Sequence, residues 1–111
     1  MAYITSMEII ETPVFTKQVI TLLNDDEYKM LQQYLICRPD AGALIVGGGG
    51  LRKLRWKLPG KGKSGGIRTI YYWDHQESIY MLFCYPKNEM EDLTRSQLLQ
   101  LRKYGKEFLH G

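Results

Sequence analysis

The sequence predicts an α+β fold with a single domain over residues 1–111, in which a small antiparallel β-sheet packs against an N-terminal helical hairpin and a C-terminal helix. Three observations predict this fold. The first third of the chain has apolar residues at helical spacing, the middle alternates apolar and polar residues as strands do, and the last part returns to helical spacing. With 111 residues and an apolar share of 44%, the chain is long enough for one modest core.

Two capped helices are predicted after a short strand over residues 7–11. Thr12 is expected to cap a helix over residues 13–23, which begins with a proline, a residue that suits the first helical position. Asn24 and Glu27 have the spacing of a capping box, so a second helix is expected to begin there and to end before the next proline. Together the two helices form the predicted hairpin.

A meander of three strands is predicted in the middle of the chain, over residues 51–58, 67–74 and 78–85. A glycine-rich loop over residues 41–50 precedes the meander, and residues 74–77 form a tight turn between its last two strands. Alternation places four residues of the third strand on one face, namely Ile79, Met81, Phe83 and Tyr85.

The C-terminal helix is predicted to begin after the capping box of Thr94 and Gln97. One side of this helix is apolar and consists of Leu98, Leu101, Tyr104 and Phe108. The resulting order of elements is β-α-α-β-β-β-α, and the sequence has neither an internal repeat nor a linker.

The chain has the features expected of a cytoplasmic protein. No window approaches the roughly 18 apolar residues that a membrane-spanning helix needs, and the N-terminus lacks the charged and apolar regions of a secretion signal. Cys37 and Cys84 stand apart in apolar runs, so both are expected to be small buried hydrophobes, although the sequence alone leaves a disulfide open. The sequence leaves open whether Met1 or Met7 is the native start.

A run of seven Lys and Arg residues without an acid, from Leu51 to Arg68, is the strongest functional signal. If residues 51–58 form a strand, one face carries Leu51, Lys53, Arg55 and Lys57, and the other carries Arg52, Leu54, Trp56 and Leu58. The glycine-rich segment that follows keeps its charge through Lys61 and Lys63. A row of cations beside a basic loop suits phosphate groups, so we expect a polyanionic partner. The alternative is an ordinary solvated sheet face, where such cations discourage aggregation.

Other chemical motifs are weak. The glycines of residues 60–65 match a dinucleotide-binding fingerprint letter by letter, but a predicted strand follows where that fingerprint requires a helix. His75 lies in a predicted turn and His110 is next to last, so neither is expected to be catalytic. Because no spacing matches a metal site, an enzyme with this sequence is expected to work without histidine, metal or cofactor.

Three segments together resemble the toxins of the RelE/ParE superfamily, in its HigB-like branch. They are residues 50–55 (GLRKLR), 60–72 (GKGKSGGIRTIYY) and 85–93 (YPKNEMEDL). The combined string is specific, whereas any one piece is not. The predicted order of elements also agrees with the RelE-like fold, so the resemblance covers most of the chain from Met7 onward.

The resemblance implies the toxin of a type II toxin–antitoxin system, a ribosome-dependent endoribonuclease (mRNA interferase) that cuts translated mRNA in the decoding site and so inhibits translation. Its expected partners are the ribosome, mRNA and a helix-turn-helix antitoxin, through which alone it would reach operator DNA; no membrane partner is expected. The implied catalytic residues are Lys53, Arg55, Arg68, Tyr85 and Lys87. The residues expected to bind RNA or the ribosome are Arg52, Lys57, Lys61, Lys63 and Asn88. Some relatives have an arginine in place of Asn88 and a catalytic tyrosine near Thr94, so the identity of the general acid stays open.

RNA cleavage without a metal uses the 2′-hydroxyl as nucleophile on the adjacent phosphate, which leaves a 2′,3′-cyclic phosphate and a 5′-hydroxyl. The arginines are expected to stabilise the charge on the phosphate, because a guanidinium group binds two oxygens at once. Lys53 or Lys87 is a candidate for the proton acceptor, and Tyr85 can stack on a base or donate a proton. Three alternatives remain: a ParE-like toxin that poisons DNA gyrase, a module that binds RNA or the ribosome without cutting, and a degenerate toxin that only binds its antitoxin.

Overall fold

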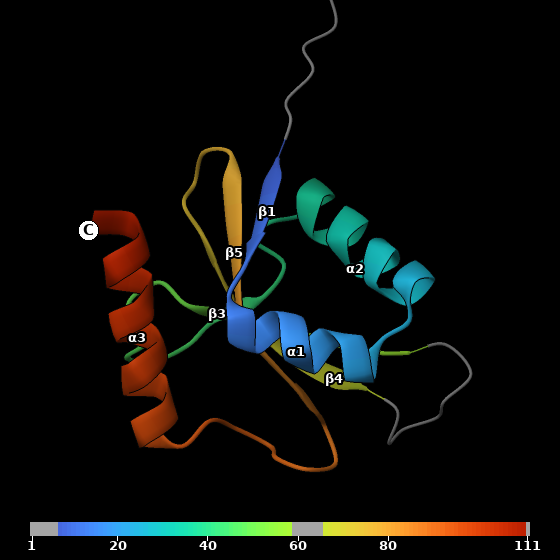
Figure 1. Cartoon of the computed structure of the whole chain (residues 1–111). Helices are drawn as coiled ribbons and strands as arrows, with labels where there is room; N and C mark the ends of the chain where they lie inside the picture. Colours follow the sequence, from blue (N-terminus) through green and yellow to red (C-terminus); the bar gives the residue numbers. More distant parts are fainter. Residues whose placement is uncertain (1–6, 59–65, 111) are drawn as a thin grey trace, which may run out of the picture.

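The protein forms a five-stranded mixed β-sheet with helices on both faces (Figure 1). The structure, a computed structural model, describes residues 7–58 and 66–110, apart from the side chains of residues 108–110. Its elements are β1 (Glu8–Glu11), α1 (Pro13–Leu22), α2 (Asp25–Cys37), β2 (Ala43–Leu44), β3 (Arg52–Trp56), β4 (Ile67–Trp73), β5 (Ser78–Pro86) and α3 (Arg95–His110). The strand order across the sheet is β1-β5-β4-β3-β2. The predicted α+β class and the three-strand meander are confirmed.

Two strand pairings differ from the predicted sheet. β1 pairs with β5 in parallel, from Glu8 beside Ser78 to Glu11 beside Met81, so the sheet is mixed and not purely antiparallel. β2 lies within the segment that was predicted as a loop, and it pairs antiparallel with β3. Neither pairing has a local signal, because β1 is far from β5 in the chain and β2 has only 2 residues.

Side-chain caps begin all three helices, as the sequence predicts. Thr12 Oγ1 accepts a hydrogen bond from a backbone N–H in the first turn of α1 at 3.1 Å. The capping box of Asn24 and Glu27 opens α2, with both hydrogen bonds at 2.8 Å. Thr94 and Gln97 open α3 in the same way, at 2.9 and 3.1 Å. Each cap satisfies N–H groups that the first helical turn leaves without a partner.

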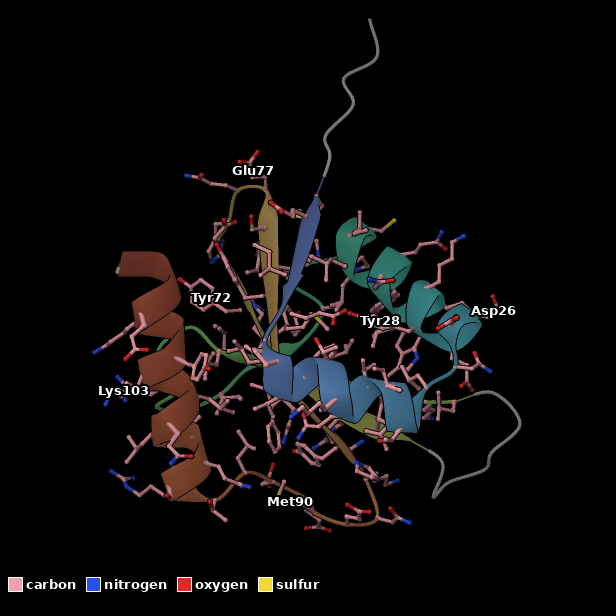
Figure 2. All side chains as sticks on the ribbon, viewed as in Figure 1. Asp26, Tyr28, Tyr72, Glu77, Met90 and Lys103 are labelled. Carbon is pink, nitrogen blue, oxygen red and sulfur yellow. The ribbon has the colours of Figure 1, made fainter. Side chains whose placement is uncertain are left out.

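Each face of the sheet has its own apolar core. α1 and α2 cover one face, whose buried residues include Phe15, Val19, Leu31, Leu35, Leu54, Tyr71, Ile79, Met81 and Cys84. α3 covers part of the other face, whose core consists of Leu51, Ile70, Leu82 and Tyr85, with Leu98 and Leu101 of α3 packed against it. Figure 2 shows Tyr72 on the side of α3 and Tyr28 on the side of α2. The alternation predicted for residues 51–58 is confirmed, while the side chain of Phe108, placed on the apolar side of α3, lies outside the described residues.

A β-bulge at Leu82 reverses the alternation of β5. Two neighbouring residues of β4 pair with Met81 and Phe83, so Leu82 between them is the extra residue. Before the bulge, Ile79 and Met81 face α1 and α2; after it, Phe83 and Tyr85 face α3. The prediction that these four residues share one face is therefore wrong.

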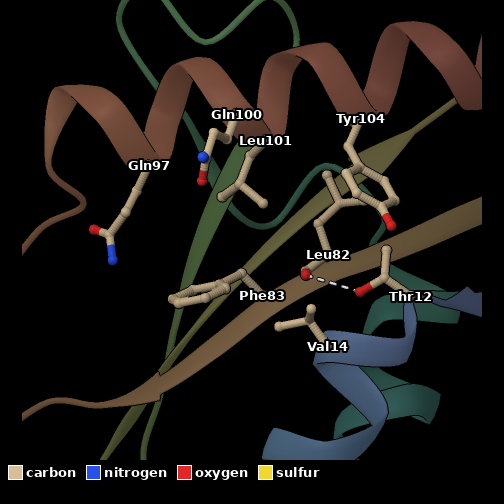
Figure 3. A pocket seen from close by; sticks show the side chains of 8 residues that line it. All are labelled: Thr12, Val14, Leu82, Phe83, Gln97, Gln100, Leu101 and Tyr104. Atoms are coloured by element: carbon tan, nitrogen blue, oxygen red, sulfur yellow. Dashed lines mark hydrogen bonds between the residues drawn. The ribbon is translucent and has the colours of Figure 1, made fainter.

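β1 ends before it reaches the bulge. Hydrogen bonds from Thr12, the cap of α1, and from Gln18 of α1 stabilise this part of β5 instead. Thr12 donates its hydroxyl to the carbonyl of Leu82 at 3.0 Å (Figure 3) and its backbone N–H to the carbonyl of Met81 at 3.0 Å. Gln18 Oε1 accepts a hydrogen bond from the backbone N–H of Cys84 at 2.8 Å. These groups of Thr12 and Gln18 satisfy backbone groups along the end of β5 that a neighbouring strand would otherwise satisfy.

The two cysteines are free, and they differ in burial. Cys84 is buried, as predicted, but Cys37 is exposed at the end of α2, which corrects the prediction that both are buried. Leu35 faces the core, and a helical residue two positions later points to the opposite side, which explains the exposure of Cys37.

Candidate functional site

Three neighbouring strands place two arginines and a tyrosine in one row, on the face of the sheet that α3 covers in part. Arg55 of β3 stands opposite Arg68 of β4, and Arg68 stands opposite Tyr85 of β5. The bulge at Leu82 creates this row, because regular alternation along β5 would turn Tyr85 to the face of α1 and α2.

Three lysines surround the row. Lys53 lies two residues before Arg55, and therefore on the same face of β3. Lys57 follows the end of β3, and Lys87 follows the end of β5, where its backbone N–H donates to the carbonyl of Gly66 at 2.9 Å. We call the residues Lys53, Arg55, Lys57, Arg68, Tyr85 and Lys87 the basic cluster.

α3 leaves part of the basic cluster open to solvent. Leu98 and Leu101 of α3 pack over another part of this face. Arg55 is exposed and Arg68 is half-buried, whereas Tyr85 is only 4% exposed. An anion from solution therefore reaches Arg55 directly and Arg68 in part, next to the almost fully buried Tyr85.

Asp92, in the segment between β5 and α3, faces the basic cluster, although the sequence did not single it out. Its Oδ1 forms an ion pair with Lys53 Nζ. The side chain of Lys53 is 18% exposed and that of Asp92 is 72% exposed. No periodic pattern relates two residues so far apart in the chain, so the sequence offers no signal for this contact.

The charges of the basic cluster and burial shift two pKa values. The hydrogen bond and the charge of Lys53 lower the pKa of Asp92, and Arg55 and Arg68 act in the same direction. Burial raises the pKa of Tyr85, and the charge of Asp92 raises it further, whereas Arg68 and Arg55 oppose this shift. Tyr85 therefore keeps its proton at neutral pH, and its hydroxyl donates to a backbone carbonyl in the segment after β5 at 3.4 Å. In this state the phenol carries the proton that a general acid would need.

The other residues expected to bind RNA are not all part of this group. Arg52 points to the side of α1 and α2, where its guanidinium donates to two backbone carbonyls before β2 at 3.1 and 2.8 Å. Those bonds fasten the chain that leads into β2. Asn88 is exposed in the turn after β5. Lys61 and Lys63 lie outside the described residues.

An open groove of about 880 Å³ adjoins the basic cluster. Lys53, Arg55 and Asp92 line it together with the exposed apolar side chains of Leu44 and Val46. A smaller hollow of about 140 Å³, lined mainly by apolar and amide side chains, lies between α1, β5 and α3 (Figure 3). The large groove gives a polyanion room to approach the cations.

Among the described side chains, no group of three or more His, Cys, Asp or Glu residues could hold a metal ion. Within residues 7–58 and 66–110, no helix is long and apolar enough to cross a membrane.

Residues 40–110 match the family described as the RelE toxin of the RelE/RelB toxin–antitoxin system. This part of the chain contains the whole basic cluster and Asp92. Among solved structures, a double mutant of the E. coli toxin RelE in the free state is similar, with a TM-score of 0.56 and 14% identity over 90% of this chain and 97% of that one. At that identity the likeness shows the fold alone. Because the family match spans more than half of the chain, this protein belongs to the RelE toxin family of toxin–antitoxin systems.

Proposed function

We propose that this protein is the toxin of a type II toxin–antitoxin system and acts as a ribosome-dependent mRNA endoribonuclease of the HigB-like kind. The observation that carries the proposal is the row of Arg55, Arg68 and Tyr85 across three strands. Two guanidinium groups on neighbouring strands suit a phosphate, and a protonated phenol lies next to them. Membership of the RelE toxin family supports the same function.

The proposed reaction is an attack of the 2′-hydroxyl of the RNA on the adjacent phosphate, with a 2′,3′-cyclic phosphate and a 5′-hydroxyl as products. Arg55 and Arg68 stabilise the negative charge that develops on the phosphate oxygens. Lys53 or Lys87, in its unprotonated amine form, accepts the proton of the 2′-hydroxyl, and Tyr85, which keeps its own proton at neutral pH, donates to the leaving 5′-oxygen.

The ribosome supplies the in-line geometry that an open row of side chains cannot impose on free RNA. The proposed partners are therefore the decoding site of the ribosome, the mRNA in it and a cognate RelB-type antitoxin. A helix-turn-helix domain in that antitoxin would connect the toxin to operator DNA. This function requires a protein of the cytoplasm.

Mapping of 5′ ends on a defined mRNA with purified ribosomes tests the proposal, with the wild type, Arg68→Ala and Arg38→Ala compared. Arg38 is an exposed arginine at the end of α2, the helix that covers the opposite face of the sheet, so Arg38→Ala controls for the loss of one positive charge. We expect new 5′-hydroxyl ends inside codons with the wild type and Arg38→Ala. With Arg68→Ala, cutting should fall by about 10²- to 10³-fold, the usual effect of removing a group that stabilises transition-state charge.

Other outcomes would favour other functions. No new ends at any protein concentration would contradict the nuclease function. Intact mRNA in this assay, together with DNA damage when the protein is expressed in cells, would favour a gyrase poison, which needs no phosphate-binding cluster. RNA binding that weakens with salt but leaves the RNA intact would favour a non-catalytic module.

A further inference from the structure

The ion pair between Lys53 and Asp92 places a carboxylate where the proposed function requires a phosphate. Asp92 contacts the amine of Lys53, and both side chains line the same open groove as Arg55. We propose that Asp92 is an internal counter-ion, which occupies the anion site of the basic cluster in the free protein and is displaced by a phosphate of the RNA. This role rests on the proposed function, because that function identifies the displacing anion as RNA.

The carboxylate of Asp92 interacts with several members of the basic cluster. Lys53 has the largest effect on its pKa, through a hydrogen bond and through charge, and Arg55 and Arg68 lower the same pKa. The charge of Asp92 in turn raises the pKa of Tyr85. Asp92 therefore shares its surroundings with the groups to which the proposed reaction assigns the phosphate.

Asp92 is positioned to leave the basic cluster without unfolding the chain. Its side chain is 72% exposed, whereas Lys53 is held on β3 and is 18% exposed. The two residues after Asp92 anchor the backbone, because Leu93 packs against the core beneath α3 and Thr94 caps that helix. Since an exposed ion pair has a small net stability, a phosphate that also contacts the arginines can replace the carboxylate.

Proton acceptance is a less suitable role for Asp92. The cations that lower its pKa stabilise the ionised carboxylate, and a carboxylate stabilised in this way is a weaker base. Removal of the carboxylate is therefore expected to change anion binding, which can be measured without any cutting.

Binding of a short single-stranded 2′-deoxy oligonucleotide tests this role, because a strand without 2′-hydroxyl groups cannot undergo the proposed cleavage. The wild type, Asp92→Asn and Glu91→Gln are compared over a range of salt concentrations. Glu91 is exposed and adjacent, so Glu91→Gln removes the same charge from the same segment. We expect Asp92→Asn to bind about two- to fivefold more tightly than Glu91→Gln, as the loss of an exposed ion pair would allow. The slope of log affinity against log salt should also be steeper by about 0.7. In the wild type the displaced carboxylate of Asp92 takes up a cation and so offsets one that the strand releases, whereas this offset is missing in Asp92→Asn.

A second pair of variants checks that the effect of Asp92→Asn on binding depends on Lys53. With Lys53→Gln already present, Asp92→Asn should no longer steepen the salt dependence. Equal affinity and slope for Asp92→Asn and Glu91→Gln would overturn the inference, as would weaker binding by Asp92→Asn or no binding by any of the proteins. Because cutting on ribosomes is measured separately, a failure of the counter-ion role is distinguishable from a failure of the nuclease function.

Discussion

Tyr85 combines burial with a position beside two arginines, so the role of its hydroxyl can be isolated by one substitution. Tyr85→Phe keeps the ring, which packs in the core beneath α3, and removes the proton that the proposed reaction needs. We expect single-turnover cutting on ribosomes to fall by about 10²-fold or more, as for the loss of a general acid. The free energy of unfolding should change by less than about 1 kcal/mol, because the phenol makes a long hydrogen bond of 3.4 Å.

Tyr72→Phe is the matched control for this substitution. Tyr72 is half-buried and packs against the same core, but it lies outside the row of Arg55, Arg68 and Tyr85. Its variant should cut at the wild-type rate. Wild-type cutting by Tyr85→Phe as well would show that the leaving oxygen receives its proton from another group.

Single residues of the site differ in how far the sequence predicts them. Lys53 and Arg55 follow from alternation along one strand, because two residues two positions apart share a face whatever the sheet does elsewhere. Asp92 has no such signal, since its contact with Lys53 exists only after the segment that follows β5 has folded back over the sheet. The cations were therefore predictable, while the acid that pairs with one of them was not.

The bulge in β5 is an element-scale feature whose stability depends on Thr12. Thr12→Val keeps the shape of the side chain but removes the cap of α1 and leaves the buried carbonyl of Leu82 without its hydroxyl donor. We expect the free energy of unfolding to fall by about 2 kcal/mol or more, the combined effect of a lost helix cap and an unsatisfied buried carbonyl. Urea denaturation measures this change.

Thr21→Val controls for the loss of a threonine hydroxyl from α1. Thr21 is exposed and its hydroxyl donates to the carbonyl of Gln18 at 2.8 Å, so the change in the free energy of unfolding should stay within about 0.5 kcal/mol. Cutting provides a second readout, because a one-residue slip of β5 would move Tyr85 to the other face. Equal stability of the Thr12 and Thr21 variants would contradict the role assigned to Thr12.

The N-termini of the helices were predictable because a cap and its partner lie within a few residues of each other, as Asn24 and Glu27 do. The bulge at Leu82 was not predictable from the pattern of β5, whose apolar residues fit an unbroken strand equally well. The residue that stabilises the bulge lies about 70 residues earlier in the chain, since Thr12 donates a hydrogen bond to the carbonyl of Leu82. The same distance in sequence explains why the parallel pairing of β1 with β5 was missed.

At the scale of the whole molecule, a buried thiol and several buried phenols make the free energy of unfolding depend on pH in the alkaline range. Burial raises the pKa of the Cys84 thiol to about 11, and it also raises the pKa values of Tyr28, Tyr71 and Tyr85. The folded protein thus holds these protons more tightly than the unfolded chain does. Their contribution to stability is fully present below the ordinary pKa values, which for the thiol is 9.0, and is lost as the pH rises through the raised values.

We therefore expect the free energy of unfolding, measured by urea denaturation, to fall steadily from about pH 9 upward. Tyr28→Phe tests the part of this pH dependence that Tyr28 contributes. Tyr28 donates to Glu11 at 2.5 Å, and its pKa is raised by burial and then by that carboxylate. The variant should be less stable than the wild type at neutral pH, since the hydrogen bond is lost. Its alkaline slope should be shallower, by at most about 1.4 kcal/mol per pH unit, the value for one proton. An unchanged slope would mean that the phenol of Tyr28 titrates alike in the folded and unfolded chains, and that its hydrogen bond to Glu11 contributes nothing to the pH dependence of stability.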